Sequence, residues 1–475
     1  MANLKETFSC EGKWWLPGET GDPLLGTLHY HFQEGLKLEL KGIFKPFIKK
    51  DPRTSNSPVI LGESDHGEKI TLYGCACKGV KAPLFSTKEQ RAPSFSAFNC
   101  SIAFTDHHFS STEEMKFKKI FVNFSHLDDW LGSSGFNITP DYDKETETSK
   151  ILIEYIQPKP IIIKINEIFT ITIDFFYNLP TGYYNQSEAT IKQLITVCVE
   201  STDDCKISDF FEGIKQLERF FSLGIMRPSH AFNFMGIMTN PNEKIEKYQI
   251  PIKIYKALNE NIDVREKIYQ EVMLFAYDDI QNNFDRLLQN WFNKREALQP
   301  VFDLYFTAVH NQYMPDHLEF LSYIQAIESF HRRTRNNCIR PKQEFTRLRD
   351  NIFAKLDEDE KELIGPLDYA NEPSLKDRLN EIFKEYYEIP PFFSIKKDQF
   401  IRDVVNTRNF HTHYSENLKK KTLASANLHD ATRKLRAILQ LIFLLELGFD
   451  RDGINKFAVK IHRWQLDVIS TTFKI

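Results

Sequence analysis

An arginine and two histidines lie close together in the C-terminal part of the chain, at Arg408, His411 and His413. Arginine carries a planar fork of N–H donors that fits the non-bridging oxygens of a phosphodiester. Histidine can take up and release a proton near neutral pH. Asn409, directly after the arginine, adds a neutral hydrogen-bonding group. These residue types are the ones needed around a phosphodiester bond that is to be cleaved.

The segment that holds these residues is patterned as a helix. At about 100° per residue, one broad apolar arc is formed by Phe400, Ile401, Val404, Val405 and Thr412, and Arg408 falls near the middle of it. A cation there is unfavourable unless it is paired or faces a polar cleft. On the same ideal helix His413 lies about 140° from Arg408 and His411 only about 60°. Either histidine could therefore be the working one, and Arg-x4-His spacing is also common among solvated surface residues.

Length, charge and cysteine content indicate which kind of protein the chain is. A chain of 475 residues predicts two to four domains. The net charge of −4 gives no overall positive field, so an anionic partner must be held by a local patch. Seven cysteines without dense spacing indicate a reducing compartment. With no apolar leader segment and no uncharged apolar run near about 18 residues, we expect a soluble cytoplasmic protein without membrane contact.

The first half of the chain, residues 1–255, is predicted to be β-rich, of sandwich or barrel type. Short segments alternate apolar and polar residues with period two and are separated by turn residues. One stretch, 209–223, has helical spacing instead. The predicted strands are 36–40, 69–73, 116–122, 161–165, 169–175 and 250–255.

The second half, residues 256–475, is predicted to be helical. Its apolar residues follow helical spacing, and proline and glycine mark the breaks, including Pro300, Pro315 and Gly448. The segment 423–447 carries a continuous apolar stripe that suits the core of a helical bundle. The predicted helices are 263–298, 299–313, 316–334, 342–357, 374–388, 397–414, 423–447 and 454–472.

Two features of the first half invite a chemical interpretation. Cys75 and Cys77, with His66 and the run 106–108, could be zinc ligands, but their spacing is not that of a zinc site. A strand that places two small residues on one face explains the pair better, and no metal is expected. Adjacent tryptophans at residues 14 and 15 could form an aromatic binding surface or close the end of a β-domain, and we favour the second.

A basic segment follows the predicted helix 316–334. Residues 331–349 include seven basic residues and only one acidic residue. Such a cluster could contact the phosphates of RNA or could be a solvated helix end. A second cluster follows the Arg-His segment. The candidate RNA-binding residues are Arg332, Arg333, Arg335, Lys419, Lys420 and Lys421.

The N-terminal sequence resembles a known family. Residues 12–17 read Gly-Lys-Trp-Trp-Leu-Pro, and Gly26-Thr27-Leu28 and a strand that ends at Gly42 follow. This order is similar to the N-terminal domain of the ApeA-type anti-phage proteins, in which a C-terminal HEPN ribonuclease domain follows. The Trp-Trp-Leu-Pro string is fairly specific.

The C-terminal sequence resembles the HEPN domain. HEPN domains are helical bundles with the signature Arg, four to six residues, then His, and a polar residue usually follows the Arg. Arg408, Asn409 and His413 match that form and precede a long apolar helix. The helix 318–333, which contains Glu328 and His331, resembles the early helix of ApeA-like HEPN domains and adds two secondary candidates.

The resemblance implies a function. HEPN ribonucleases need no metal or other cofactor and pair two protomers so that two Arg-His motifs line one cleft. We therefore expect a homodimeric anti-phage endoribonuclease with Arg408, Asn409 and His413 as catalytic residues and His411 in reserve. It would act by abortive infection after a phage-derived trigger, with residues 1–255 sensing or regulating.

Two other functions remain open from the sequence. The chain could be a catalytically silent HEPN module that binds RNA or a nucleotide. It could also be a ligand-binding β-domain protein whose helices only dimerise. An exposed aromatic groove at residues 14 and 15, together with a salt bridge of Arg408 within the chain, would favour this function.

Overall fold

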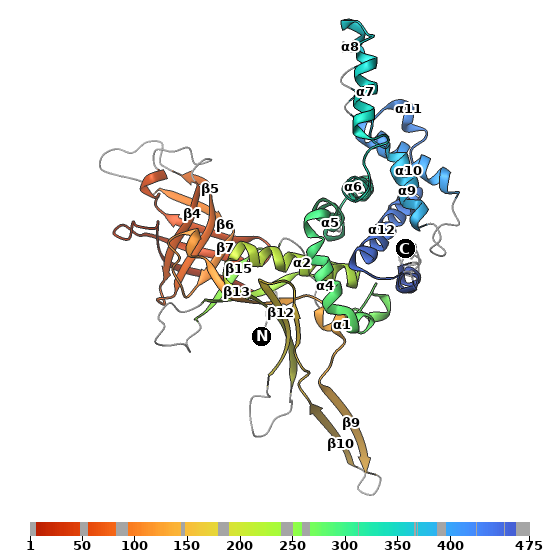
Figure 1. Cartoon of the computed structure of the whole chain (residues 1–475). Coiled ribbons are helices and arrows are strands. Elements are labelled where there is room, and N and C mark those ends of the chain that lie inside the picture. Colours follow the sequence, from red (N-terminus) through yellow and green to blue (C-terminus); the bar gives the residue numbers. More distant parts are fainter. Residues whose placement is uncertain are drawn as a thin grey trace. The chain divides into compact units, whose positions relative to one another are not determined.

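The chain forms two compact units. A computed structural model describes residues 6–461 apart from 48–55, 82–93, 144–147, 179–189, 239–249, 259–266, 312, 365–366, 368, 387–395, 424 and 451. The β unit comprises Met1–Ile225, Ser229–Gln270 and Ala276–Asp285, and the helical unit comprises Met226–Pro228, Glu271–Phe275 and Arg286–Ile475. The predicted α+β class, with β structure first and helices second, is confirmed (Figure 1). None of the helices in the described ranges is long and apolar enough to cross a membrane.

Six strands of the β unit close into a barrel. Their order is β5-β4-β1-β2-β3-β6, and β6 pairs back with β5, so that the ring of antiparallel ladders is complete. Closure leaves no unpaired edge strand among the six. The strands are β1 Thr7–Trp15, β2 Leu24–His31, β3 Gly35–Lys41, β4 Asn56–Ser64, β5 Lys69–Lys81 and β6 Phe95–Cys100.

The remaining strands extend the same sheet beyond the barrel through β5–β7 pairing, in the order β7-β15-β14-β8-β13-β12-β11. The helix α2, Ile207–Ile225, packs on β13, β8 and β14. A separate two-stranded ribbon is formed by β9, Phe136–Asp143, and β10, Thr148–Tyr155. The extending strands are β7 Ile102–Thr105, β8 Lys116–Phe124, β11 Ile161–Lys164, β12 Phe169–Asn178, β13 Lys192–Lys206, β14 Ala231–Met238 and β15 Ile250–Lys256.

Trp14 belongs to the barrel core. Its side chain is fully buried, its indole N–H donates to the Gly26 carbonyl at 3.2 Å, and Gly62 leaves the space in which the ring lies. Trp15 is only half-buried and meets the His108 ring edge-on. The structure thus places Trp14 in the core of the β-domain, whereas closure of an end of the domain by the pair stays a prediction.

The cysteines of β5 also face the barrel core. Cys75 and Cys77 are two residues apart on one strand and are both buried with the apolar side chains of the barrel. Burial raises the pKa of the Cys75 thiol well above its usual range. The structure thus places them as two small side chains on one face of a strand. Within the described ranges, no group of three or more His, Cys, Asp or Glu residues could hold a metal ion.

The helical unit is built around α12, whose apolar residues are buried almost continuously. It packs against α6, which also contacts α5, α9 and α10. Residues 452–461 form a further helical segment, and the rest of the predicted helix 454–472 lies outside the described residues. The helices of the chain after residue 276 are α3 Tyr277–Ile280, α4 Phe284–Asn293, α5 Arg295–His310, α6 Asp316–Thr334, α7 Lys342–Phe353, α8 Glu358–Ile364, α9 Leu375–Tyr386, α10 Lys397–His413, α11 Glu416–Lys419 and α12 Ala426–Leu447.

The prediction of one helix over 263–298 was wrong. Residues 267–276 are not α-helical, and two helices, α3 and α4, follow them. The reason lies in contacts from a distant part of the chain. Asp129 accepts a hydrogen bond from the Ile268 backbone N–H at 3.0 Å, and the Gln270 amide donates to the carbonyls of Asp129 and Trp130. These bonds hold the backbone in a non-helical path that local spacing does not reveal.

The prediction that Pro300 ends a helix was also wrong, since it lies inside α5. Proline lacks an N–H, so the carbonyl four residues earlier, that of Glu296, loses its usual donor. Arg333 of α6 replaces that donor: its Nη2 donates to the Glu296 carbonyl at 2.9 Å, and its Nε donates to the Ala297 carbonyl. An exposed arginine on a neighbouring helix thus stabilises the interrupted helix.

This arrangement predicts a coupling between Arg333 and Pro300. Replacing Arg333 by alanine should lower the free energy of unfolding of the helical unit by about 1–2 kcal/mol, because a carbonyl is left without a donor. In a Pro300→Ala background the backbone N–H returns, and the same change should cost about half as much or less. Urea denaturation of the four proteins of this double-mutant cycle measures the coupling. Equal costs in both backgrounds would show that Arg333 does not supply the missing donor.

Candidate functional site

The helix α10 carries the Arg-His segment and presents one side to the core of the helical unit. Phe400, Ile401 and Val404 of the predicted apolar arc are buried, whereas Val405 is half-buried and Thr412 is exposed. Thr407, which the arc did not include, is also buried. The Thr407 hydroxyl donates to the Asp403 carbonyl at 2.7 Å and accepts from the Leu423 backbone N–H at 3.0 Å. These bonds tie α10 to the segment that leads into α12, and they fix the position of the next residue, Arg408.

Arg408 is partly buried and is paired within the chain. Its side chain is 27% exposed, and Nη2 lies 3.4 Å from Oε2 of Glu328 on α6. Nη1 donates to the Asn409 side-chain carbonyl at 3.2 Å. The Nε atom is buried and has no hydrogen-bond partner among the described residues. The cation on the apolar arc is therefore paired, which offsets its partial loss of hydration, and it keeps donor capacity for an anion.

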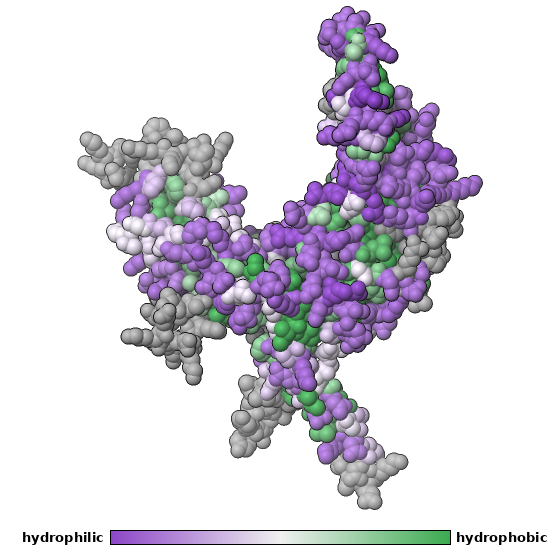
Figure 2. Space-filling view, in the orientation of Figure 1, coloured by the Kyte–Doolittle hydropathy of each residue, from purple (hydrophilic) through white to green (hydrophobic). Residues whose placement is uncertain are grey.

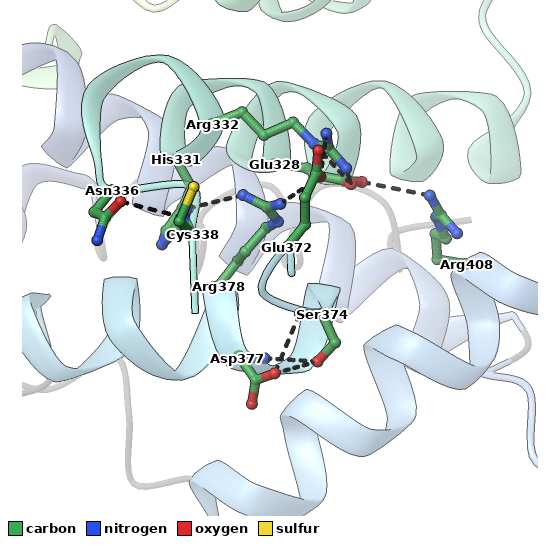
Figure 3. Close-up of polar contacts among 10 residues, drawn as sticks. All are labelled: Glu328, His331, Arg332, Asn336, Cys338, Glu372, Ser374, Asp377, Arg378 and Arg408. Atoms are coloured by element: carbon green, nitrogen blue, oxygen red, sulfur yellow. Dashed lines mark hydrogen bonds and ion pairs between the residues drawn. The ribbon is translucent and has the colours of Figure 1, made fainter. Parts of the chain in front are cut away.

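Glu328 is shared by two arginines (Figure 3). Its Oε2 contacts Arg408, and its Oε1 accepts from Arg332 Nη2 at 3.4 Å on the same helix. Arg332 is held in turn by Glu372, whose Oε2 lies 2.6 Å from Arg332 Nη1 and 3.2 Å from Arg378 Nη2. Three arginines and two glutamates thus alternate in one network from α6 to α9 and α10.

Arg378, at the buried end of this network, determines which ring nitrogen of His331 carries the proton. The ring is fully buried, and its Nδ1 lies 3.1 Å from Arg378 Nη1. Because a guanidinium only donates hydrogen bonds, Nδ1 must accept, and the ring proton of the neutral histidine is on Nε2. Nε2 then donates to Oε2 of Glu381 at 2.9 Å. His331 is therefore placed as an inner structural partner of Arg378, away from solvent.

Arg378, Glu372 and Glu381 were not identified from the sequence. Burial, and then the nearby Arg332, lower the pKa of the Arg378 guanidinium. A signal was available, since Arg378 falls in the apolar stripe of α9 between the half-buried Leu375 and the buried Ile382, as Arg408 does on α10. A cation in an apolar stripe thus marks a candidate functional residue on α10 and a fully buried member of the ion-pair network on α9.

The two candidate histidines occupy different surroundings. His413 is the last helical residue of α10, and its side chain is exposed. Tyr414 has a φ of 51°, in the left-handed region, which ends the helix there. His411 is half-buried: its ring stacks on His317 of α6 with centroids 5.3 Å apart, and both ring nitrogens are buried without a hydrogen-bond partner in the described part of the chain.

The candidate RNA-binding residues also fall into two groups, arginines that are paired within the helical unit and lysines that are exposed. Arg332 belongs to the network of Glu328, Arg333 binds carbonyls of α5, and Arg335 pairs with Glu385 at 2.7 Å. These contacts give the three arginines a role within the helical unit. Lys419 pairs loosely with Glu416, at 3.6 Å, and all three candidate lysines are exposed after the end of α10. The members of this exposed cluster are Lys419, Lys420 and Lys421.

The surroundings of His411 predict a dependence of stability on pH. Burial, and then His317, lower the pKa of His411 in the folded protein. Between this value and the unfolded value of about 6.5, the unfolded state binds more protons, so the free energy of unfolding falls as pH falls. We expect wild-type protein to lose more melting temperature than His411→Gln between about pH 7.5 and about pH 5.5. The exposed His413→Gln variant is the control and should follow the wild type. An equal loss in all three proteins would contradict the assignment.

Two family models match the chain. The family described as ApeA N-terminal domain 1 matches residues 9–291, more than half of the chain. The family described as Apea-like HEPN matches residues 321–453, which include Glu328, His331 and the Arg408–His413 segment. Nothing matches among curated proteins or among solved structures. The two matched families follow each other in the order that the sequence resemblance implied.

Proposed function

The chain belongs to the ApeA family, and from this premise we propose that it is an anti-phage endoribonuclease that cuts RNA without a metal ion. The observation that carries the proposal is the end of α10, where Arg408 is held at 3.4 Å by Glu328 while His413 stays exposed. A positioned guanidinium and an exposed imidazole are the two groups that RNA transesterification needs. RNA is the substrate and a second copy of the chain is the partner.

The residues suggest the following steps. His413 accepts the proton of the ribose 2′-hydroxyl while the 2′-oxygen attacks the neighbouring phosphorus. Arg408 donates to the non-bridging oxygens, on which negative charge grows. The bond to the 5′-oxygen breaks, and a histidine from the second protomer of the pair gives that oxygen a proton. The products carry a 2′,3′-cyclic phosphate and a 5′-hydroxyl, and DNA is not cut because it lacks the 2′-hydroxyl.

Asn409 and Glu328 support Arg408 in this proposal. Asn409 accepts from Arg408 Nη1 and can orient the guanidinium or, after a small movement, the phosphate. Glu328 holds Nη2 in the absence of RNA. An incoming phosphate would compete with a carboxylate that is already shared with Arg332. The exposed lysines that follow α10 would add favourable contacts to the RNA backbone.

The two parts of the chain have separate tasks in the proposal. Residues 256–475 form the ribonuclease, which pairs with the same region of a second copy so that each site has two histidines. Residues 1–255 sense the infection, and a phage-derived signal received there aligns the two HEPN motifs. Restraint of this kind is required, since an unregulated ribonuclease would damage its own host. Cleavage after infection would then stop phage growth by abortive infection.

The test is incubation of purified protein with total bacterial RNA in the presence of EDTA, with and without extract from phage-infected cells. Wild-type protein should cut RNA and leave cyclic-phosphate ends. His413→Ala should abolish cleavage with fold and oligomeric state unchanged, while His411→Ala should retain it. The reverse result would make His411 the working histidine. Full activity of both single variants would overturn the assignment of an α10 histidine.

One observation favours a second candidate function. Arg408 is already satisfied in part by Glu328 in the single chain, which suits a catalytically silent HEPN module that binds RNA or a nucleotide. Binding of RNA without strand scission, under every condition of infection, would select that function. A ligand-binding β-domain has one of its two expected signs, the ion pair of Arg408, but lacks the other, because the buried Trp14 is not available to an aromatic groove.

A further inference from the structure

The ribbon of β9 and β10 has one face that is apolar except at Ser149. Opposite residues of an antiparallel pair share a face, and the register pairs Phe136 with Tyr155, Ile138 with Ile153, and Pro140 with Ile151. Tyr142, opposite Ser149, completes the row. We refer to this surface as the apolar ribbon face; its members are Phe136, Ile138, Pro140, Tyr142, Ile151, Ile153 and Tyr155.

The other face of the ribbon is polar. The register there pairs Asp141 with Lys150 and Asn137 with Glu154. Leu152, opposite Thr139, is the only large apolar residue on it among the residues of the two strands. The ribbon is therefore amphipathic, like a surface strand pair that covers a core, although its apolar face is open to solvent.

Little of this surface is covered within the chain. Ile138, Tyr142, Ile151 and Ile153 are 61%, 58%, 66% and 49% exposed. Only the base of the ribbon is packed, where Tyr155 contacts the rings of Phe136 and Tyr177 with centroids 4.8 and 5.2 Å apart. The ribbon extends from the rest of the β unit (Figure 1), and apolar residues recur along it in the surface view (Figure 2).

The base holds the ribbon in a defined direction. The Gln193 side chain accepts from the Gly135 N–H at 3.0 Å and donates to the Ser133 carbonyl at 2.9 Å. Gln157 donates to the Phe175 carbonyl of β12. Three side-chain hydrogen bonds thus anchor an element that has no packed face of its own. An isolated two-stranded ribbon is at best marginally stable in water, so this one gains most from a partner that covers the apolar ribbon face.

The geometry points to a second copy of this chain as that partner: we propose that two apolar ribbon faces pack against each other across a twofold axis. Five members of the face are exposed, and with about 100 Å² each they present roughly 500 Å², which equals the largest apolar patch of a typical monomer. Two copies would bury about 1,000 Å² in total, at the lower limit of specific protein–protein interfaces.

The absence of charge on the apolar ribbon face favours a second copy of the chain as its partner. It carries no charged side chain, so it offers nothing that would recognise a charged partner. A face of this kind is complementary to itself, as an interface across a twofold axis requires. In such a pair the polar faces, with Asp141, Lys150 and Glu154, stay in water on the outside. The proposal does not depend on the nuclease activity, because the ribbon belongs to the β unit.

Matched variants of the full chain test the surface. Ile151→Glu and Ile153→Glu place a charge on the apolar ribbon face, and Leu152→Glu places the same charge between them on the polar face. Analytical ultracentrifugation over a range of concentrations should show that each of the first two raises the dimer dissociation constant by at least about tenfold. Leu152→Glu, which starts from a side chain of similar exposure, 55%, should leave it unchanged. Circular dichroism verifies that all three variants are folded.

Photo-cross-linking separates this contact from any contact made by the helical unit. A benzoylphenylalanine at position 142 should give a cross-linked dimer, and the same group at position 152 should not. A dimer that tolerates all three charges and gives no cross-link from position 142 would overturn the proposal, as would a chain that stays monomeric at every concentration. The last result would assign the face to a different class of partner.

Discussion

Arg408→Lys should lower the rate of RNA cleavage by about 10²–10³-fold, although the positive charge is kept. An ammonium group cannot donate along two parallel directions to a phosphate as the guanidinium does. It also cannot bind Glu328 and Asn409 together in the way that Nη2 and Nη1 do. Cleavage of a labelled RNA under single-turnover conditions measures the effect on the chemical step.

The control for this experiment is on the same helix. Arg402 is exposed and hydrogen-bonds to Gln399 one turn earlier. Arg402→Lys should leave the cleavage rate within about twofold of wild type, since surface changes away from the site have small effects. Equal activity of Arg408→Lys and Arg402→Lys would mean that Arg408 acts as a simple charge or has no part in the reaction. Loss of activity in both would point to RNA binding by the helix as a whole.

Arg378→Met should destabilise the helical unit by about 3 kcal/mol. The guanidinium is fully buried, and its removal leaves Nδ1 of His331 without a donor and Glu372 with only Arg332. Methionine fills much of the same volume, so the loss comes from the broken network and not from a cavity. The consequence reaches the candidate site, because Glu372 positions Arg332, which shares Glu328 with Arg408.

Hydrogen exchange gives the clearest measurement of this effect, because it reports on each element of a chain with two units. Amides of α6 and α9 should exchange about 10²-fold faster in Arg378→Met, and those of the barrel strands should be unchanged. Lys376→Met, at an exposed position of the same helix, is the matched control and should exchange as wild type does. Unchanged protection in Arg378→Met would show that the buried network contributes little net stability.

Much of the fold follows from local pattern. The alternating strands and the long apolar helix are specified by side chains a few residues apart, and their predicted positions agree with β3, β5, β8, β12 and α12. The errors arise where distant residues intervene. The segment 267–276 is held out of a helix by hydrogen bonds to Asp129 and Trp130, and α5 continues through Pro300 because Arg333 supplies a donor. Neither contact can be predicted from the spacing of residues within the segment.

The candidate site shows the same division. Residue types and their order along the chain were enough to recognise the family. Spacing within one helix was enough to place Arg408 on an apolar arc and to name two candidate histidines. The surroundings of these residues depend on contacts between distant helices. The tertiary structure paired Arg408 with Glu328, eighty residues earlier, and buried His331 against Arg378. It also exposed His413 and stacked His411 on His317. Burial and ion pairing between helices depend on how the helices pack, and spacing within one helix does not contain that information.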